Sequence, residues 1–133
     1  MLRLWPPSWM FSRRLIEPLT LGGRTIQAGT MCLISPALLH RDARYFPDPL
    51  KFDPGRWTES FEASLPRFAY FPFGGGPRLC IGNNFALTEA TLVIALTAQR
   101  YRLDLVPGQT VKAKPKGTLR PRPAVWMAPR LAS

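Results

Sequence analysis

The chain has 133 residues, the size of one ordinary domain, and 46% of them are apolar, which excludes a disordered tail. Eighteen Lys and Arg against eight Asp and Glu give a net charge of +10, and 15 prolines argue against a simple helix bundle. Two cysteines and one histidine exclude a disulfide scaffold and a Cys/His zinc set, and no run of apolar residues is long enough to span a membrane.

The first third of the chain predicts short elements separated by turns. Residues 1–7 resemble the last turn of a helix that a proline pair ends, and no cap precedes that turn. Residues 15–35 predict a β region, with a hairpin turn at residues 22–23. Residues 36–45 predict a short helix whose cap is Ser35 and whose first position is a proline.

The rest of the chain divides into a proline-punctuated segment, a helix and a β region. Residues 46–79 predict irregular structure, and a long ordered loop of this kind is usually functional. Residues 83–100 predict a helix that is apolar nearly all round and therefore buried. Residues 101–130 contain short strand-like pieces.

The run from Phe71 to Gly82 carries the chemistry. Four glycines and two prolines give it a tight backbone path, and Cys80 lies just before the predicted helix. Backbone N–H groups, the helix dipole and the charge of Arg78 all favour a thiolate there. A thiolate can be a nucleophile or a metal ligand, but the only histidine, His40, lies in another segment. A metal ligand needs a shield from water, for which the candidates are Phe71, Phe73, Ile81 and Phe85.

The pattern of this loop resembles the heme-binding loop of cytochrome P450 enzymes. The match holds at all five fixed positions, Phe73-x-x-Gly76-x-Arg78-x-Cys80-x-Gly82. Upstream, Phe52–Trp57 resembles the meander of that family, and Leu2–Pro7 resembles the end of its Glu-x-x-Arg helix. The resemblance covers essentially the whole chain and is nearest to bacterial members that resemble fatty-acid hydroxylases.

The resemblance implies roles for the residues of the loop. Cys80 would be the thiolate ligand of the iron of heme b, and Arg78 would pair with a heme propionate. Arg13 is the candidate for a second propionate partner. The remaining residues expected to contact the cofactor are Phe73, Gly76, Ile81, Gly82, Phe85 and Ala86.

Outside the loop, the resemblance implies a substrate pocket and a structural cluster. Arg3 and Arg56 would belong to a buried cluster with a glutamate, but that glutamate would precede Met1 and is absent from this sequence. Two buried arginines without their carboxylate would be costly. Four positions resemble pocket-lining positions: Ser8, Met10, Gly117 and Thr118.

The resemblance implies an α+β fold, the C-terminal portion of the mainly α cytochrome P450 fold. Residues 1–133 would form one partial domain, in which 46–72 are the meander, 73–82 the heme-binding loop and 101–130 the C-terminal β region. The implied activity is a monooxygenase reaction that uses O2 on a small hydrophobic organic substrate. Electrons would come from a ferredoxin, a flavodoxin or a flavin reductase at a basic face. We expect a cytoplasmic protein, and no turnover from this short chain alone.

Two alternatives remain open beside the enzyme. The chain can be a truncated, non-catalytic fragment, or a basic module that binds an anionic partner. No acid follows Asp104, but the basic residues alternate with prolines rather than with stacking aromatics, so we expect no nucleic-acid partner and interpret the tail mainly as a solvated face. Cys32 is expected to be a buried small side chain, and His40 a structural hydrogen-bonding residue. The basic residues of the tail are Lys112, Lys114, Lys116, Arg120, Arg122 and Arg130.

Overall fold

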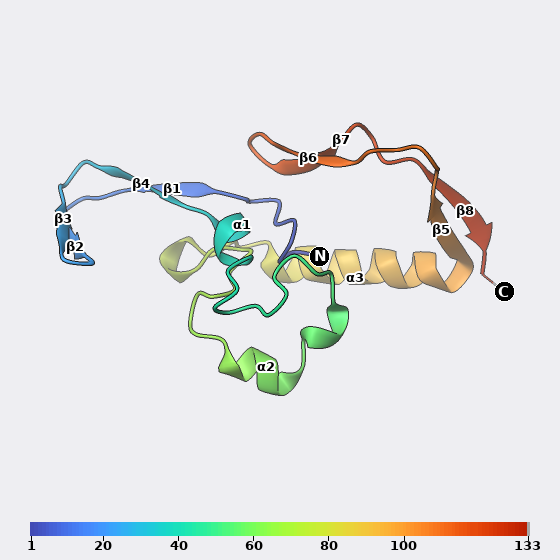
Figure 1. Cartoon of the computed structure of the whole chain (residues 1–133), viewed down its shortest axis with the longest axis horizontal. Coiled ribbons are helices and arrows are strands. Elements are labelled where there is room, and N and C mark those ends of the chain that lie inside the picture. Colours follow the sequence, from blue (N-terminus) through green and yellow to red (C-terminus); the bar gives the residue numbers. More distant parts are fainter. Residues whose placement is uncertain (133) are drawn as a thin grey trace. The chain divides into compact units, whose positions relative to one another are not determined.

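The structure, a computed structural model, describes residues 1–132 and divides the chain into two units (Figure 1). The first unit is Met1–Pro72, and the second begins at Phe73. Each unit contains one hairpin nested inside another, so in both units the chain returns alongside its own path.

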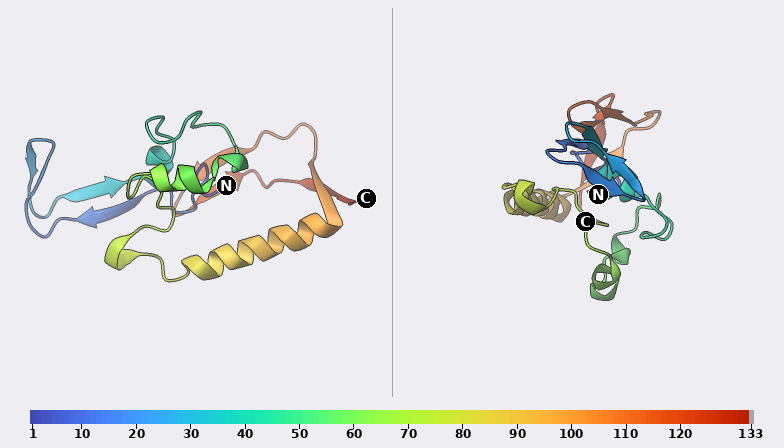
Figure 2. Two further views of the ribbon diagram at one scale, coloured as in Figure 1. Left: turned by 90° about the horizontal axis from the view of Figure 1, so that it is seen from below. Right: turned by 90° about the vertical axis from the view of Figure 1, so that its left-hand side faces the viewer.

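A long β ribbon begins the first unit. Strand β1 (Phe11–Arg14) pairs antiparallel with β4 (Met31–Ile34), and β2 (Leu19–Leu21) pairs with β3 (Arg24–Ile26) at the far end of the ribbon (Figures 1 and 2). The turn at residues 22–23 has φ values of 56° and 74°, which glycine adopts without strain. The predicted hairpin is confirmed. Strand β1 lies before the predicted β region and was not predicted, because its Ser-Arg-Arg sequence carries no apolar alternation.

Helix α1 (Pro36–Leu39) follows the ribbon and is shorter than the predicted helix. The predicted cap is confirmed, because the Ser35 hydroxyl accepts a hydrogen bond from the Leu38 N–H at 3.3 Å. The same hydroxyl donates to the Trp9 carbonyl at 2.8 Å and so ties the start of the helix to the segment before β1.

The proline-rich segment that follows is more regular than predicted. It contains the 3-10 turn η1 (Pro54–Arg56) and helix α2 (Glu59–Ser64). The Thr58 hydroxyl caps α2 by accepting from the Phe61 N–H at 3.2 Å, and two glutamates lie in its first turn. A capping threonine followed by acidic residues was therefore the helix signal in this segment.

The first unit holds the core. Phe46 and His40 are completely buried, and the buried apolar side chains around them are Leu4, Ala69 and Phe71. The ring of His40 contacts that of Phe71 edge-on at 5.3 Å between centroids. These contacts join the N-terminal turn, α1 and the chain just before Pro72, segments that are far apart in the sequence.

The second unit is one long helix followed by two hairpins. The cysteine loop contains the 3-10 turn η2 (Gly76–Arg78) and leads into α3 (Asn83–Arg100), the predicted helix range. Strand β5 (Tyr101–Leu105) follows α3 without a break and pairs with β8 (Met127–Leu131). Between them, β6 (Lys112–Pro115) pairs with β7 (Leu119–Arg122).

The prediction that α3 is buried is wrong for this chain. No residue between 73 and 132 is buried, and Phe85 and Ile94 on α3 are 73% and 63% exposed. The helix is apolar on every side, but β5 leaves from its end and the two hairpins do not cover its length. Among residues 1–132, no helix has the length and apolar character needed to cross a bilayer.

Candidate functional site

The cysteine loop is held by its own backbone. The Cys80 N–H donates to the Phe73 carbonyl at 3.0 Å, and the Leu79 N–H donates to the Gly76 carbonyl at 3.0 Å. Gly76 has a φ of 65°, a left-handed conformation that other residues adopt only with strain, although a Cβ there would meet open space. The loop therefore needs a glycine at this position for its conformation and not for lack of room.

The loop passes directly into α3. The Asn83 N–H donates to the Cys80 carbonyl at 3.4 Å, and the Ala86 N–H donates to the Gly82 carbonyl at 2.9 Å. Gly82 has an ordinary φ of −88°, and a Cβ there would lie 3.9 Å from the Cys80 Sγ. A side chain at this position would thus touch the sulfur and cover part of it.

The Cys80 thiol is exposed and lies in an apolar setting. Its chain neighbours Leu79 and Ile81 are 50% and 104% exposed, and Phe85 in the first turn of α3 is exposed as well. Arg78, two residues before the cysteine, also reaches solvent. The loop thus presents a sulfur, apolar side chains and a cation together.

Arg3 is the centre of a second cluster, in the first unit. Its side chain is 4% exposed and donates to the carbonyls of His40 at 2.9 Å, Pro49 at 2.5 Å and Lys51 at 2.8 Å. Its guanidinium stacks 5.2 Å from the centroid of the Phe46 ring. Backbone carbonyls therefore take the place of a carboxylate partner.

Two further arginines lie near Arg3. Arg56 donates to the Pro47 carbonyl at 2.8 Å, and Arg41 donates to the carbonyls of Leu4 and Ala37. The pKa of Arg3 is lowered, first by burial and then by the charges of Arg56 and Arg41. The sequence indicated Arg3 and Arg56 as a pair, but it gave no signal for Arg41 as a third member.

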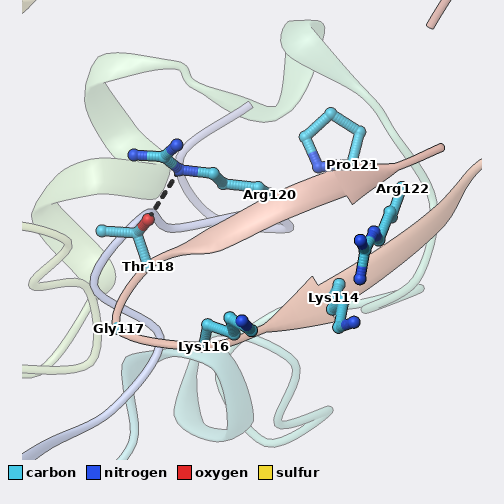
Figure 3. A pocket seen from close by; sticks show the side chains of 7 residues that line it. All are labelled: Lys114, Lys116, Gly117, Thr118, Arg120, Pro121 and Arg122. Carbon is cyan, nitrogen blue, oxygen red and sulfur yellow. Dashed lines mark hydrogen bonds between the residues drawn. The ribbon is translucent and has the colours of Figure 1, made fainter. Parts of the chain in front are cut away.

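The other candidate residues fall into separate places. Arg13, on β1, donates to the Ser12 carbonyl beside it and stacks on Phe11. Ser8 and Met10 precede β1, where Ser8 is exposed and Met10 half-buried, and Cys32, expected to be buried, is half-buried on β4. Gly117 and Thr118 form the turn between β6 and β7 and line a hollow on that hairpin (Figure 3).

Nearly all of the chain matches one protein family. A sequence model of the family described as cytochrome P450 matches residues 1–128. The chain belongs to the cytochrome P450 family. The resemblance drawn from the cysteine loop is therefore confirmed, and so is the α+β fold class of a piece of that fold.

Individual P450 relatives match nearly all of this chain, which corresponds to a small part of each of them. Cyclooctatin synthase of Streptomyces melanosporofaciens is 45% identical over 92% of this chain and 27% of its own length. Cyclooctat-9-en-7-ol 5-monooxygenase of the same organism is 49% identical over 83% of this chain and 24% of its own length. The retinoic-acid-bound cyanobacterial CYP120A1 superposes with a TM-score of 0.93 at 32% identity, over 98% of this chain and 30% of that one.

Heme is the cofactor that the P450 family implies, and the residues of the cysteine loop fit it. A cysteine thiolate is the ligand that P450 proteins offer to heme iron. Leu79, Ile81 and Phe85 are exposed apolar side chains near the cysteine, of the kind that a porphyrin would cover. The guanidinium of Arg78 is suited to a carboxylate at the edge of such a ring.

His40 is a structural residue of this P450 chain, as its sequence context predicted. Its Nε2 accepts a hydrogen bond from the Phe71 N–H at 2.9 Å, which places the proton of the neutral ring on Nδ1. Within residues 1–132, Nδ1 is buried and has no hydrogen-bond partner. Burial is the main cause that lowers the pKa of His40 from 6.5 to about 4. The backbone of Arg3 and Leu2 opposes this shift, and the charges of Arg3 and Arg41 add to it.

Acid is expected to destabilise the first unit through His40. Below pH 6.5 the unfolded chain takes up a proton on His40, whereas the folded chain does not do so until about pH 4. The free energy of unfolding should therefore decrease by about 1.4 kcal/mol for each unit that the pH is lowered from 6.5 to about 4. Urea unfolding, followed by tryptophan fluorescence from pH 7.5 to pH 5, measures this fall above the range in which carboxyl groups titrate.

An NMR titration checks this result independently, because His40 is the only histidine of the chain. Its ring carbon signals in an NMR titration should remain those of neutral imidazole down to pH 5. A ring that titrates near pH 6.5 in the folded chain, or a free energy of unfolding that is flat over this range, would contradict the role given to burial.

Proposed function

We propose that Cys80 binds the iron of heme b and that the chain supplies the thiolate side of a P450 monooxygenase site. The observation that carries this proposal is the exposed Cys80 thiol, in a loop that the Phe73 carbonyl holds and that exposed apolar side chains surround. Membership of the P450 family supports it, as does a relative named as a monooxygenase.

Each residue of the loop has a part in holding the cofactor. The hydrogen bond from Cys80 N–H to Phe73 and the left-handed Gly76 keep the sulfur at the surface of the loop. Arg78 binds one propionate, and Arg13 is the candidate for the other. The side chains that would exclude water around the sulfur once the cofactor is in place are Phe73, Ile81, Phe85 and Ala86, and Gly82 leaves one side of the sulfur uncovered.

When bound, heme supplies the iron at which O2 is reduced, so that one oxygen atom enters an organic substrate. Relatives of this chain are named for cyclooctat-9-en-7-ol and pentalenene, and these names support a small, largely hydrocarbon substrate. Ser8, Met10, Gly117 and Thr118 are our candidates for the residues that contact it.

The excess of basic residues in the second unit supports an acidic electron donor. From Phe73 onward the sequence has nine basic residues against Glu89 and Asp104. Opposite charges speed the encounter of two proteins and set their orientation. We propose a ferredoxin, a flavodoxin or the flavin domain of a reductase as the donor.

We propose that these 133 residues do not turn over substrate by themselves. The chain spans less than a third of the length of the relatives reported above, and no residue from 73 to 132 is buried. Exclusion of water is a general requirement for controlled chemistry at such a site, and the second unit as described has no buried residue to supply it.

Heme binding can be tested with the purified chain and hemin. We expect stoichiometric uptake and, after reduction under carbon monoxide, the strongly red-shifted Soret band of a thiolate-ligated iron. Hemin alone, carried through the same reduction, gives the reference spectrum. A band at the reference position would contradict the proposal that this chain binds heme through a cysteine. Substrate hydroxylation by the pure chain with a reductase would contradict the proposed inactivity.

A further inference from the structure

The β6–β7 hairpin carries an unusual arrangement of charge. Its register places Lys112 opposite Arg122 and Lys114 opposite Arg120. Residues that face each other across an antiparallel pair project to the same side, and so do residues two apart on one strand. These four cations therefore share one face of the hairpin, whereas Ala113, Pro115, Leu119 and Pro121 share the other.

The four cations lack a counter-charge among the residues that the structure describes. No acid follows Asp104 in the sequence, and within residues 1–132 the carboxylate of Asp104 pairs with Arg130 on β8, at 2.7 Å. None of the ion pairs among these residues includes a cation of the hairpin face. Like charges directly opposite each other destabilise a strand pair, so this face is stabilised by any anion that binds it.

The hairpin is held firmly enough to form a site. Gln109 closes its base, because its side-chain amide donates to the carbonyls of Val106 and Trp126 and accepts from the Trp126 N–H, all at 2.8 Å. At the other end, the Nε of Arg120 donates to the Thr118 hydroxyl at 3.0 Å (Figure 3). This bond orients the guanidinium of Arg120 and leaves its two terminal nitrogens for a ligand.

The cationic face borders a hollow of about 530 Å³. Its volume is in the range of small-molecule sites. Lysine and arginine side chains, a hydroxyl and a glycine turn line it, and none of its lining residues is acidic. The lining residues are Lys114, Lys116, Gly117, Thr118, Arg120, Pro121 and Arg122 (Figure 3).

We propose that this hollow binds the diphosphate group of a small organic molecule. A guanidinium and an ammonium can bind one phosphate group between them, and Lys114 and Arg120 form such a cross-strand pair at the hollow. Arg122 adds a second guanidinium to the lining, so a single carboxylate would neutralise only one of these three cations. Gly117 and Thr118, which are also candidates for substrate contact, lie in the turn of the hairpin, whereas the cations that would bind the diphosphate lie on its strands. The site needs no heme, so its test is independent of the monooxygenase proposal.

The test uses the complete chain and inorganic pyrophosphate as the probe. Calorimetric titration should show binding with one site per chain, and NMR should show that the backbone amides of residues 112–122 shift together. Lys114→Gln combined with Arg120→Gln should weaken binding at least tenfold. The control is Arg24→Gln combined with Arg102→Gln, which removes the same charge from exposed positions elsewhere and should change the affinity less than twofold.

Further variants distinguish a site on this hairpin from a loss of folding and from binding elsewhere in the chain. Lys114→Arg with Arg120→Lys keeps the charge and should retain binding, and circular dichroism shows whether each variant is folded. Cys80→Ala should bind pyrophosphate as the original chain does. Three results would overturn the proposal: no binding, equal weakening in the control, or binding to vesicles of phosphatidylglycerol and phosphatidylcholine that pyrophosphate does not compete with.

Discussion

Replacement of Cys80 by alanine is expected to abolish the red-shifted Soret band of the reduced, carbon monoxide-treated chain. The sulfur would be the only atom of the protein bonded to the iron, so its removal eliminates the thiolate spectrum rather than shifting it. The Cys80 side chain is exposed, and removing it should change the free energy of unfolding without hemin by less than about 0.5 kcal/mol. A spectrum lost without a loss of stability identifies a ligand and not a structural residue.

The matched control is Cys32→Ala, because Cys32 is the only other cysteine of the chain. Its side chain lies half-buried in the middle of β4, so the substitution should cost about 1 kcal/mol of stability and leave the Soret band in place. If Cys32→Ala removes the band, or if Cys80→Ala keeps it, the iron is held by another group and the assignment of Cys80 is wrong.

The family could be recognised from the sequence because the chemistry of the loop depends on residue types at fixed positions. The left-handed backbone at position 76 requires a glycine, and an iron ligand at position 80 requires a sulfur. Requirements of this kind fix the residue type, so they can be recognised in the sequence. The capped helix α1 and the glycine hairpin at residues 22–23 were predictable for the same reason, since both depend on local side-chain or backbone chemistry.

Features that depend on the surroundings of an element were not predictable. The pattern of α3 predicted a helix, and its apolar residues on every side predicted burial, but exposure depends on what packs against the helix. The acceptors of Arg3 are backbone carbonyls, which every residue type carries, so no sequence pattern indicates them. The clamp from Gln109 to Trp126 spans 17 residues and likewise has no local signal.

Substitution of Arg3 by methionine is expected to be the most destabilising single change in the first unit. Methionine keeps an apolar stem of similar reach but leaves the carbonyls of His40, Pro49 and Lys51 without their donor. An unsatisfied buried polar group costs about 1–3 kcal/mol, so three of them give about 3–6 kcal/mol after partial rehydration. Relief of repulsion from Arg41 and Arg56 offsets a smaller part of this loss.

Two controls distinguish the hydrogen bonds of Arg3 from its charge. Arg3→Lys keeps the charge but lacks the planar fork that reaches several carbonyls. Its free energy of unfolding should therefore lie between that of the original chain and that of Arg3→Met. Arg14→Met removes an exposed arginine that donates to the Gly29 carbonyl at 3.3 Å and should cost less than about 1 kcal/mol. Urea unfolding followed by tryptophan fluorescence gives all three values. Equal stability of Arg3→Lys and the original chain would mean that the positive charge alone braces the core, because a lysine cannot reproduce the three-carbonyl geometry.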